Sequence, residues 1–286
     1  MRFRTEIELR PSEWKIDHNA PVVMLGSCFT DEIGERMEHD GFEVVHNPFG
    51  PLYNPLSLAN CIGRAAQAKV YTAADLTVGP RGFHCLDYAM RFSGPDATVL
   101  LEEINNVQTL LGSAIERASV AVLTLGSAFV FDIAATGKVA GNCHKFPADA
   151  FRRRLLGVDE SAAALSRCVE SLVSAGVGHV LFTVSPIRHL ADGLHGNTVS
   201  KATLHLAVEE VCALHEGRCA YFPSYEILVD DLRDYRFYAS DMKHPSVTAV
   251  DYIYEKFATA YFSPATQRRC ADARRAFLAA NHRPVL

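Results

Sequence analysis

The fold is decided by the stretch Val22-Val23-Met24-Leu25-Gly26-Ser27-Cys28-Phe29-Thr30, which continues over 31–37 as Asp-Glu-Ile-Gly-Glu-Arg-Met. The apolar run at 22–25 predicts a buried strand, and the residues from Thr30 onward follow a helical pattern. Ser27 therefore stands at a tight turn between a strand and a helix. A serine in that position is what an α/β hydrolytic enzyme needs, provided that a base comes from elsewhere in the chain.

Apolar runs and helical patterns alternate along the rest of the chain. The further predicted strands are 43–46, 120–125, 179–184 and 219–222, and the predicted helices are 30–39, 100–117, 161–175, 199–216 and 246–262. Such alternation predicts a parallel sheet that is covered on both faces and joined by right-handed crossovers. We therefore expect a three-layer α/β/α sandwich with a five-stranded parallel sheet in the order 2-1-3-4-5.

The domain organisation follows from the segments that do not fit this alternation. Residues 1–286 are expected to form a single domain, in which 51–99 is an insertion that covers part of the site. A hairpin over 129–139 is expected to deliver 141–145 to the site. The tail, residues 263–286, is expected to form a surface helix.

Polar and turn-forming residues gather where the predicted strands end. Parallel α/β sheets bind ligands beyond the carboxyl ends of their strands. Ser27 ends the first strand, Gly50 lies just after the second and Ser127 just after the third. The sequence 185–189 follows the fourth strand and 223–226 follows the fifth. The site is therefore expected at this edge.

A base for Ser27 is available late in the chain. Asp241 and His244 are three residues apart, so the carboxylate can hold the imidazole by one nitrogen and leave the other for the nucleophile. Acyl transfer also needs hydrogen-bond donors for the developing oxyanion. We expect these from the N–H groups of Ser27 and Gly50 and from the side chain of Asn142.

Taken together, these residues resemble the GSCFA family, named for a Gly-Ser-Cys-Phe-Ala motif, within the SGNH (GDSL-like) hydrolase superfamily. This chain has Thr30 in place of the alanine. The resemblance covers 21–262, and its further motifs are Asn47-Pro48-Phe49-Gly50, Tyr53-Asn54-Pro55, Asn142-Cys143-His144-Lys145, Ser185-Pro186, Arg188-His189, Ser200-Lys201-Ala202, 221–226 and 233–238.

The resemblance implies a function and a catalytic set. It implies a serine esterase or O-acyltransferase that forms an acyl-enzyme through a Ser27–His244–Asp241 triad, with an acylated carbohydrate or glycan as the ester substrate. The superfamily often carries an oxyanion asparagine after strand three, where this chain has Gly126-Ser127-Ala128. Asn142 is expected to replace it, with Asn47 and Asn54 as rivals.

Other interpretations of the same residues stay open. Ser27 would also serve as a helix N-cap. Cys28 is a more nucleophilic rival, although the residue after such a turn usually tucks under the helix. Asp241 and His244 would also suit an ordinary loop-fixing hydrogen bond. The wider alternatives are a metal-assisted phosphoesterase and a catalytically inactive SGNH-like module that binds an acylated or glycan ligand.

Several side chains near these motifs are candidates for binding substrate. They are Asn47, Asn54, His144, Lys145 and Arg188.

Composition narrows the possible partners. A net charge of −5 and the absence of long Lys or Arg runs argue against nucleic acid. The longest uncharged stretch, 118–131, is too short for a membrane helix, and the first residues lack a signal-peptide pattern. The eight cysteines form no C-x-x-C pair and the histidines show no ligand spacing. We therefore expect a cytoplasmic enzyme with reduced thiols, no metal and no cofactor.

Overall fold

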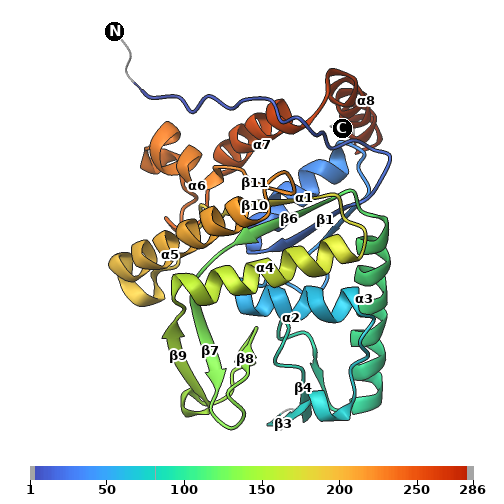
Figure 1. Cartoon of the computed structure of the whole chain (residues 1–286), viewed down its shortest axis with the longest axis vertical. Helices are drawn as coiled ribbons and strands as arrows, with labels where there is room; N and C mark the ends of the chain where they lie inside the picture. The colour runs from blue at the N-terminus through green and yellow to red at the C-terminus, as the bar shows by residue number, and fades with distance from the viewer. Residues whose placement is uncertain (1–3, 81, 282–286) are drawn as a thin grey trace, which may run out of the picture.

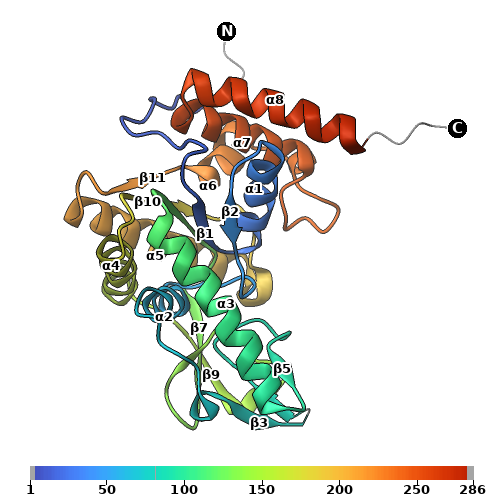
Figure 2. The same cartoon turned by 90° about the vertical axis from the view of Figure 1, so that its right-hand side faces the viewer.

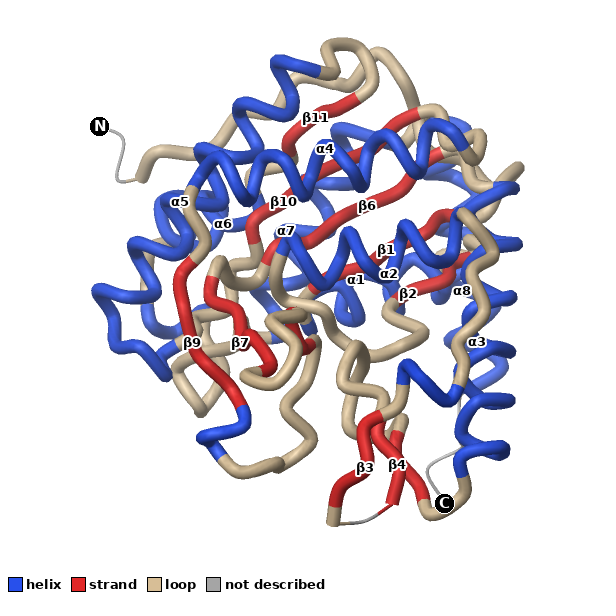
Figure 3. The backbone as a smooth tube through the Cα atoms, turned by 60° about the horizontal axis from the view of Figure 1, so that its bottom comes forward, coloured by secondary structure: helices blue, strands red, loops and turns tan. Residues whose placement is uncertain are grey.

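The computed structural model describes residues 4–80 and 82–281. Its central sheet has five parallel strands in the order β2-β1-β6-β10-β11 (Figure 3). The strands are β1 (Val22–Gly26), β2 (Val44–His46), β6 (Val120–Leu125), β10 (His179–Val184) and β11 (Cys219–Tyr221). The order predicted from the sequence is confirmed.

Helices cover both faces of this sheet, as Figures 1 and 2 show. One face carries α2 (Pro55–Ala66), α3 (Ala97–Arg117), α4 (Val158–Ser174) and α5 (Gly193–Leu214). The other carries α1 (Cys28–His39) and α7 (Val247–Tyr261), with α8 (Pro264–Asn281) packed against α1. None of the helices that the structure describes is long and apolar enough to cross a membrane.

Alternation along β1 connects the two layers. Val23 and Leu25 belong to the apolar core shared with α2 to α5, whereas Val22 and Met24 belong to the core shared with α1 and α7. All four side chains are buried. Because helices cover both faces of this parallel sheet, β1 needs apolar side chains on both faces.

Two small antiparallel sheets lie together at the lower end of the molecule in Figure 1. One consists of β7 (Phe129–Ile133), β8 (Val139–Ala140) and β9 (Phe151–Leu155). The other consists of β3 (Thr77–Gly79), β4 (Gly82–His84) and β5 (Ser93–Gly94), and it contacts the end of α3 (Figure 2). The predicted hairpin over 129–139 is confirmed by β7 and β8.

Short helical segments complete the chain. They are η1 (Ala73–Asp75), η2 (Ala148–Ala150), η3 (Leu190–Asp192), α6 (Ser224–Glu226), the π-helical η4 (Ile227–Leu232) and η5 (Tyr235–Phe237).

The elements that the sequence did not predict include helix α2, strand β9 and the small sheet of β3, β4 and β5. Helix α2 lies within 51–99, where Asn54 caps its N-terminus and Pro55 occupies the first turn; Asn-Pro is a start signal that the sequence offered. Strand β9 carries the Arg152-Arg153-Arg154 cluster, in which Arg152 and Arg154 pair with the buried Asp132 of β7. The basic triplet therefore cross-links this small sheet.

Gly26 fixes how the chain leaves β1. Its φ of +147° is rare for residues with a side chain, and a Cβ built there would lie 2.1 Å from the Thr124 carbonyl oxygen. Its N–H donates to the side-chain oxygen of Asn47 at 2.9 Å. Only glycine allows β1 to approach β6 this closely at the turn.

We predict that Gly26→Ala destabilises the protein by about 3 kcal/mol or more, because the methyl group adds both a steric clash and backbone strain. The matched control is Gly63→Ala in α2, where an added Cβ meets nothing within 4 Å. That change should raise stability by about 0.5–1 kcal/mol, as expected for glycine replaced within a helix. Urea unfolding measures both, and equal stability of wild type and Gly26→Ala would contradict this account.

Candidate active site

A pocket of 400 Å³ opens beyond the carboxyl ends of β1, β6 and β10. Cys28 after β1, Ser127 after β6 and residues 187–191 after β10 line it. Phe129 and Phe131 of β7 also line it, as does His244. The position agrees with the edge that the strand ends predicted.

His244 and Asp241 form a close pair beside this pocket. The His244 Nδ1 lies 2.6 Å from Asp241 Oδ2, which leaves Nε2 without a bond to the carboxylate. The hydrogen bond from the imidazole and two backbone N–H groups lower the pKa of Asp241 well below its usual range. The carboxylate therefore stays ionised and can stabilise a protonated imidazole.

The loop that carries the pair is held from two sides. Asp241 Oδ1 accepts the N–H groups of Lys243 and His244 at 2.9 and 3.0 Å. Arg188 donates its backbone N–H to the Lys243 carbonyl and its side chain to the Met242 carbonyl. Arg188, expected to bind substrate, thus lines the pocket and also ties the His244 loop to the end of β10.

Ser27 lies beneath the pocket surface. Its exposed fraction is 0%, and it is not among the residues that line the pocket. Its Oγ accepts the Phe29 N–H at 3.3 Å as the N-cap of α1, and its own N–H donates to Thr124 at 3.0 Å. The N-cap role that the sequence allowed is confirmed.

Cys28 faces the pocket instead. It is partly exposed, it lines the pocket, and its Sγ lies 3.1 Å from the Tyr53 hydroxyl. The expectation that the residue after the turn tucks under the helix is wrong here. The reason is the Gly26 turn, which directs the Ser27 side chain to the N-cap and leaves the next side chain at the surface.

Two of the expected oxyanion donors are already engaged. The Ser27 N–H binds Thr124, and the Gly50 N–H donates to the Asn47 carbonyl at 2.7 Å. The third, Asn142, is exposed, accepts the His144 N–H and does not line the pocket. By contrast, the Cys28 N–H has no hydrogen-bond partner within the described part of the chain, as is usual for the first turn of a helix.

Among the asparagines, Asn54 is the one at the pocket wall. It caps α2 by accepting the Ser57 N–H, and its Nδ2 donates to the Ser57 hydroxyl at 3.0 Å. Asn47 is buried and braces the β1–α1 turn, where it binds Gly26, Ser27 and Asp31. Asn47 therefore supports the site from behind.

The structure does not bring His144 and Lys145 to this pocket. His144 is buried, with Nε2 2.8 Å from the Tyr88 carbonyl oxygen and Nδ1 3.2 Å from His84 Nδ1. Burial lowers its pKa. Lys145 is exposed at a φ of +59°.

Lys201 is a residue to which sequence reasoning gave no role. It is buried in α5, and its Nζ donates to the carbonyls of Gly126 and Ser185 at 2.7 Å each. Burial lowers its pKa to about 7. The Ser200-Lys201-Ala202 motif was the sequence signal that could have revealed this role. Lys201 joins the ends of β6 and β10. The Ser200 hydroxyl adds a further bond by accepting the Ala128 N–H.

The charged side chains that line the pocket are basic. Arg153, Arg188 and Lys243 line it, and no carboxylate does so among the described residues. Arg153 pairs with Asp192 outside the lining and lies over the rings of Phe129 and Phe131. The rim therefore favours a polar or negatively charged ligand.

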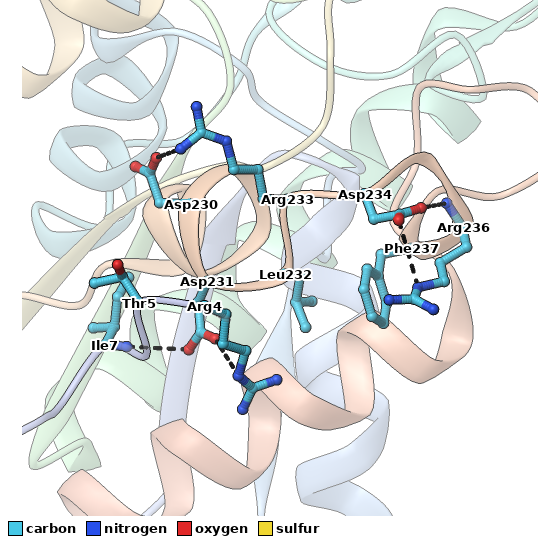
Figure 4. Close-up of a pocket in the computed structure, with 10 residues that line it drawn as sticks. All are labelled: Arg4, Thr5, Ile7, Asp230, Asp231, Leu232, Arg233, Asp234, Arg236 and Phe237. Carbon is cyan, nitrogen blue, oxygen red and sulfur yellow. Dashed lines mark hydrogen bonds and ion pairs between the residues drawn. The ribbon is translucent and has the colours of Figure 1, made fainter. Parts of the chain in front are cut away.

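A second cavity, of 820 Å³, lies under the N-terminal segment and has a different character (Figure 4). Its charges pair with one another: Arg4 lies 3.7 Å from Asp231, and Arg233 lies 3.9 Å from Asp230. Its described lining residues include no serine, cysteine or histidine. It therefore lacks the serine or cysteine and the histidine that are found in the first pocket. Within residues 4–80 and 82–281, no three metal-ligating side chains gather in a group.

The model of the GSCFA family matches residues 21–257. The chain belongs to the GSCFA family. The match includes the β1–α1 turn, Lys201 and the Asp241–His244 pair, so the pocket of this GSCFA chain is built from within the family region. No curated protein matches the chain.

The solved structures that are similar to it include two carbohydrate esterases. A carbohydrate esterase family 3 protein from Talaromyces cellulolyticus has 8% identity and a TM-score of 0.39, over 88% of this chain and 99% of that one. A carbohydrate esterase family 2 enzyme with a carbohydrate-binding domain, from Corynascus thermopiles (Myceliophthora fergusii), has 11% identity and a TM-score of 0.43, over 92% and 69%.

His189, which lines this pocket, is expected to make the stability of the protein depend on pH. Its burial and the nearby Lys201 charge lower its pKa from 6.5 to about 4. As the pH falls from 6.5 to 4, the unfolded chain takes up a proton here and the folded chain does not. Stability should therefore fall with falling pH, by at most about 1.4 kcal/mol per pH unit from this group.

We predict that His189→Phe, which retains a ring beside Tyr53, makes the stability of the protein less dependent on pH between 6.5 and 4. Urea unfolding at several pH values measures the slope. His195→Phe, an exposed histidine in α5, is the control and should keep the wild-type slope. An unchanged slope in His189→Phe would contradict the assignment.

Proposed function

We propose that this protein is a carboxylic ester hydrolase or O-acyltransferase that works through a covalent acyl-enzyme. The observation that carries the proposal is the His244–Asp241 pair, 2.6 Å apart, beside a pocket that also holds the N-terminus of α1. A base oriented by a carboxylate, next to a nucleophilic side chain and unpaired N–H groups, is the set that acyl transfer needs.

In the proposed reaction, the Gly26–Phe29 turn supplies the nucleophile and His244 Nε2 takes its proton. Asp241 holds the ring by Nδ1 and stabilises its charged form. The nucleophile adds to the ester carbonyl, His244 returns the proton to the leaving alcohol, and an acyl-enzyme remains. Water, or an acceptor hydroxyl, then releases the acyl group by the same route.

The proposed substrate is an O-acyl ester whose alcohol is a carbohydrate or glycan. The polar lining supports a hydroxyl-rich alcohol, since Asn54, Ser127 and Arg153 all contribute to the pocket. Arg188 and Lys243 at the same pocket suit an alcohol that carries a carboxylate or another anionic group. The small volume of 400 Å³ fits a short acyl chain.

We predict that His244→Ala lowers kcat for hydrolysis of p-nitrophenyl acetate by about 10² to 10⁴-fold, because proton transfer loses its base. Asp241→Asn should also lower kcat while leaving the loop folded, since an amide can still hold Nδ1 but stabilises no charge. Steady-state kinetics and thermal unfolding of each variant measure this.

His195→Ala is the matched control, since this exposed histidine of α5 lies outside the pocket. It should retain wild-type turnover. A His244→Ala enzyme that is folded and as active as wild type would contradict the proposed mechanism. A folded wild type with no turnover on any ester, but with affinity for acylated sugars, would favour the inactive binding module instead.

A further inference from the structure

The β1–α1 turn offers two adjacent nucleophiles, and their surroundings differ. We infer that the attacking atom is Cys28 Sγ and not Ser27 Oγ, so that the catalytic set is Cys28–His244–Asp241. This inference rests on the proposed acyl-enzyme mechanism. It goes beyond it by assigning the nucleophile.

Ser27 is poorly placed for attack. Its side chain is fully buried, and the pocket is lined by its neighbour rather than by Ser27 itself. Its Oγ accepts the Phe29 N–H, so a lone pair of the hydroxyl is committed to the start of α1. Its N–H and its carbonyl are engaged as well, with Thr124 and with Thr30. Exposing this hydroxyl would require the turn to open.

Cys28 meets the requirements that Ser27 does not. Its side chain shares the pocket with His244, and its Sγ lies 3.1 Å from the Tyr53 hydroxyl. The phenol stays protonated because burial raises the pKa of Tyr53. A phenolic O–H can therefore hold the sulfur atom in place by donating a hydrogen bond to it.

The backbone around Cys28 completes the arrangement. Cys28 is the first residue of α1, a helix of 12 residues, and the N-terminus of a helix favours negative charge. Its own N–H has no hydrogen-bond partner within the described residues. When Sγ adds to an ester carbonyl, the oxyanion of the tetrahedral intermediate would lie near this N–H. The residue Asn54 also lines the pocket.

Ser127 is the other hydroxyl at the pocket, and it is less suited to attack. Its Oγ accepts the Phe129 N–H at 3.0 Å and lies 3.3 Å from the Ser200 hydroxyl. These bonds hold the chain as it passes from β6 into β7. Ser127 is therefore included in the experiment as an alternative nucleophile.

The proposed step balances as follows. His244 Nε2 takes the thiol proton, the sulfur forms a bond to the ester carbonyl carbon, and the C–O bond to the alcohol breaks. The alkoxide leaves with the proton from His244, and a thioester remains on Cys28. Water then gives a proton to His244 and adds to the thioester, the C–S bond breaks, and the thiolate regains its proton.

The experiment compares wild type with Cys28→Ala, Cys28→Ser, Ser27→Ala and Ser127→Ala. Each protein is mixed with p-nitrophenyl acetate, quenched rapidly in acid and analysed by intact mass and peptide mapping. Neutral hydroxylamine is then added, because it cleaves thioesters far faster than serine esters. Circular dichroism and thermal unfolding check that each variant is folded.

We expect one acetyl group on Cys28 of wild type, removed by hydroxylamine. Cys28→Ala and Cys28→Ser should each lose turnover at least about 10³-fold, as expected when a nucleophile is removed. Ser27→Ala should keep the adduct and the turnover, while its melting temperature falls because α1 loses its cap. Cys143→Ala, which removes another partly exposed thiol, is the control and should change neither.

Two results would overturn the inference while leaving the esterase proposal intact: a hydroxylamine-resistant acetyl group on Ser27 or Ser127, or full turnover by a folded Cys28→Ala. Turnover that needs His244 but shows no acyl adduct in any variant would overturn the acyl-enzyme mechanism as well. Because Cys28→Ser preserves the size of the side chain, its loss of turnover distinguishes chemistry from misfolding.

Discussion

The structure depends on the close approach of Gly26 to Thr124, where β1 meets β6. A side chain at position 26 would overlap the Thr124 carbonyl, and the Asn47 amide holds the Gly26 N–H from the other side. Because this turn is fixed, Ser27 is directed inward to cap α1 and Cys28 outward to the pocket. One backbone constraint thus decides which of two adjacent side chains lines the pocket.

The rest of the site is assembled from distant segments by a few polar contacts. Lys201 joins the ends of β6 and β10 through two carbonyls, and Arg188 joins β10 to the loop that carries His244. The two Lys201 bonds are buried, where an unmet carbonyl costs about 1–3 kcal/mol. Because these polar groups around the pocket are hydrogen-bonded to one another, the pocket keeps its shape without a ligand.

Much of the fold could be predicted from the sequence, because each central strand is an apolar run and each crossover shows helical periodicity. The pairing of Asp241 with His244 could also be predicted, since their spacing of three suits a single turn. The orientations of the side chains at the site could not be predicted from the sequence. Whether Ser27 or Cys28 faces solvent depends on the φ of Gly26, and whether Asn47, Asn54 or Asn142 reaches the pocket depends on tertiary packing.

The most direct test of the account is a crystal structure of the protein after reaction with a slowly hydrolysed acylating ester. We expect electron density that continues from a side chain of the β1–α1 turn, namely Cys28 Sγ, into an acyl group. The acyl carbonyl oxygen should lie within hydrogen-bond distance of the Cys28 N–H, with His244 beside the sulfur. Density joined to no residue of this pocket, in crystals of active enzyme, would contradict the acyl-enzyme account.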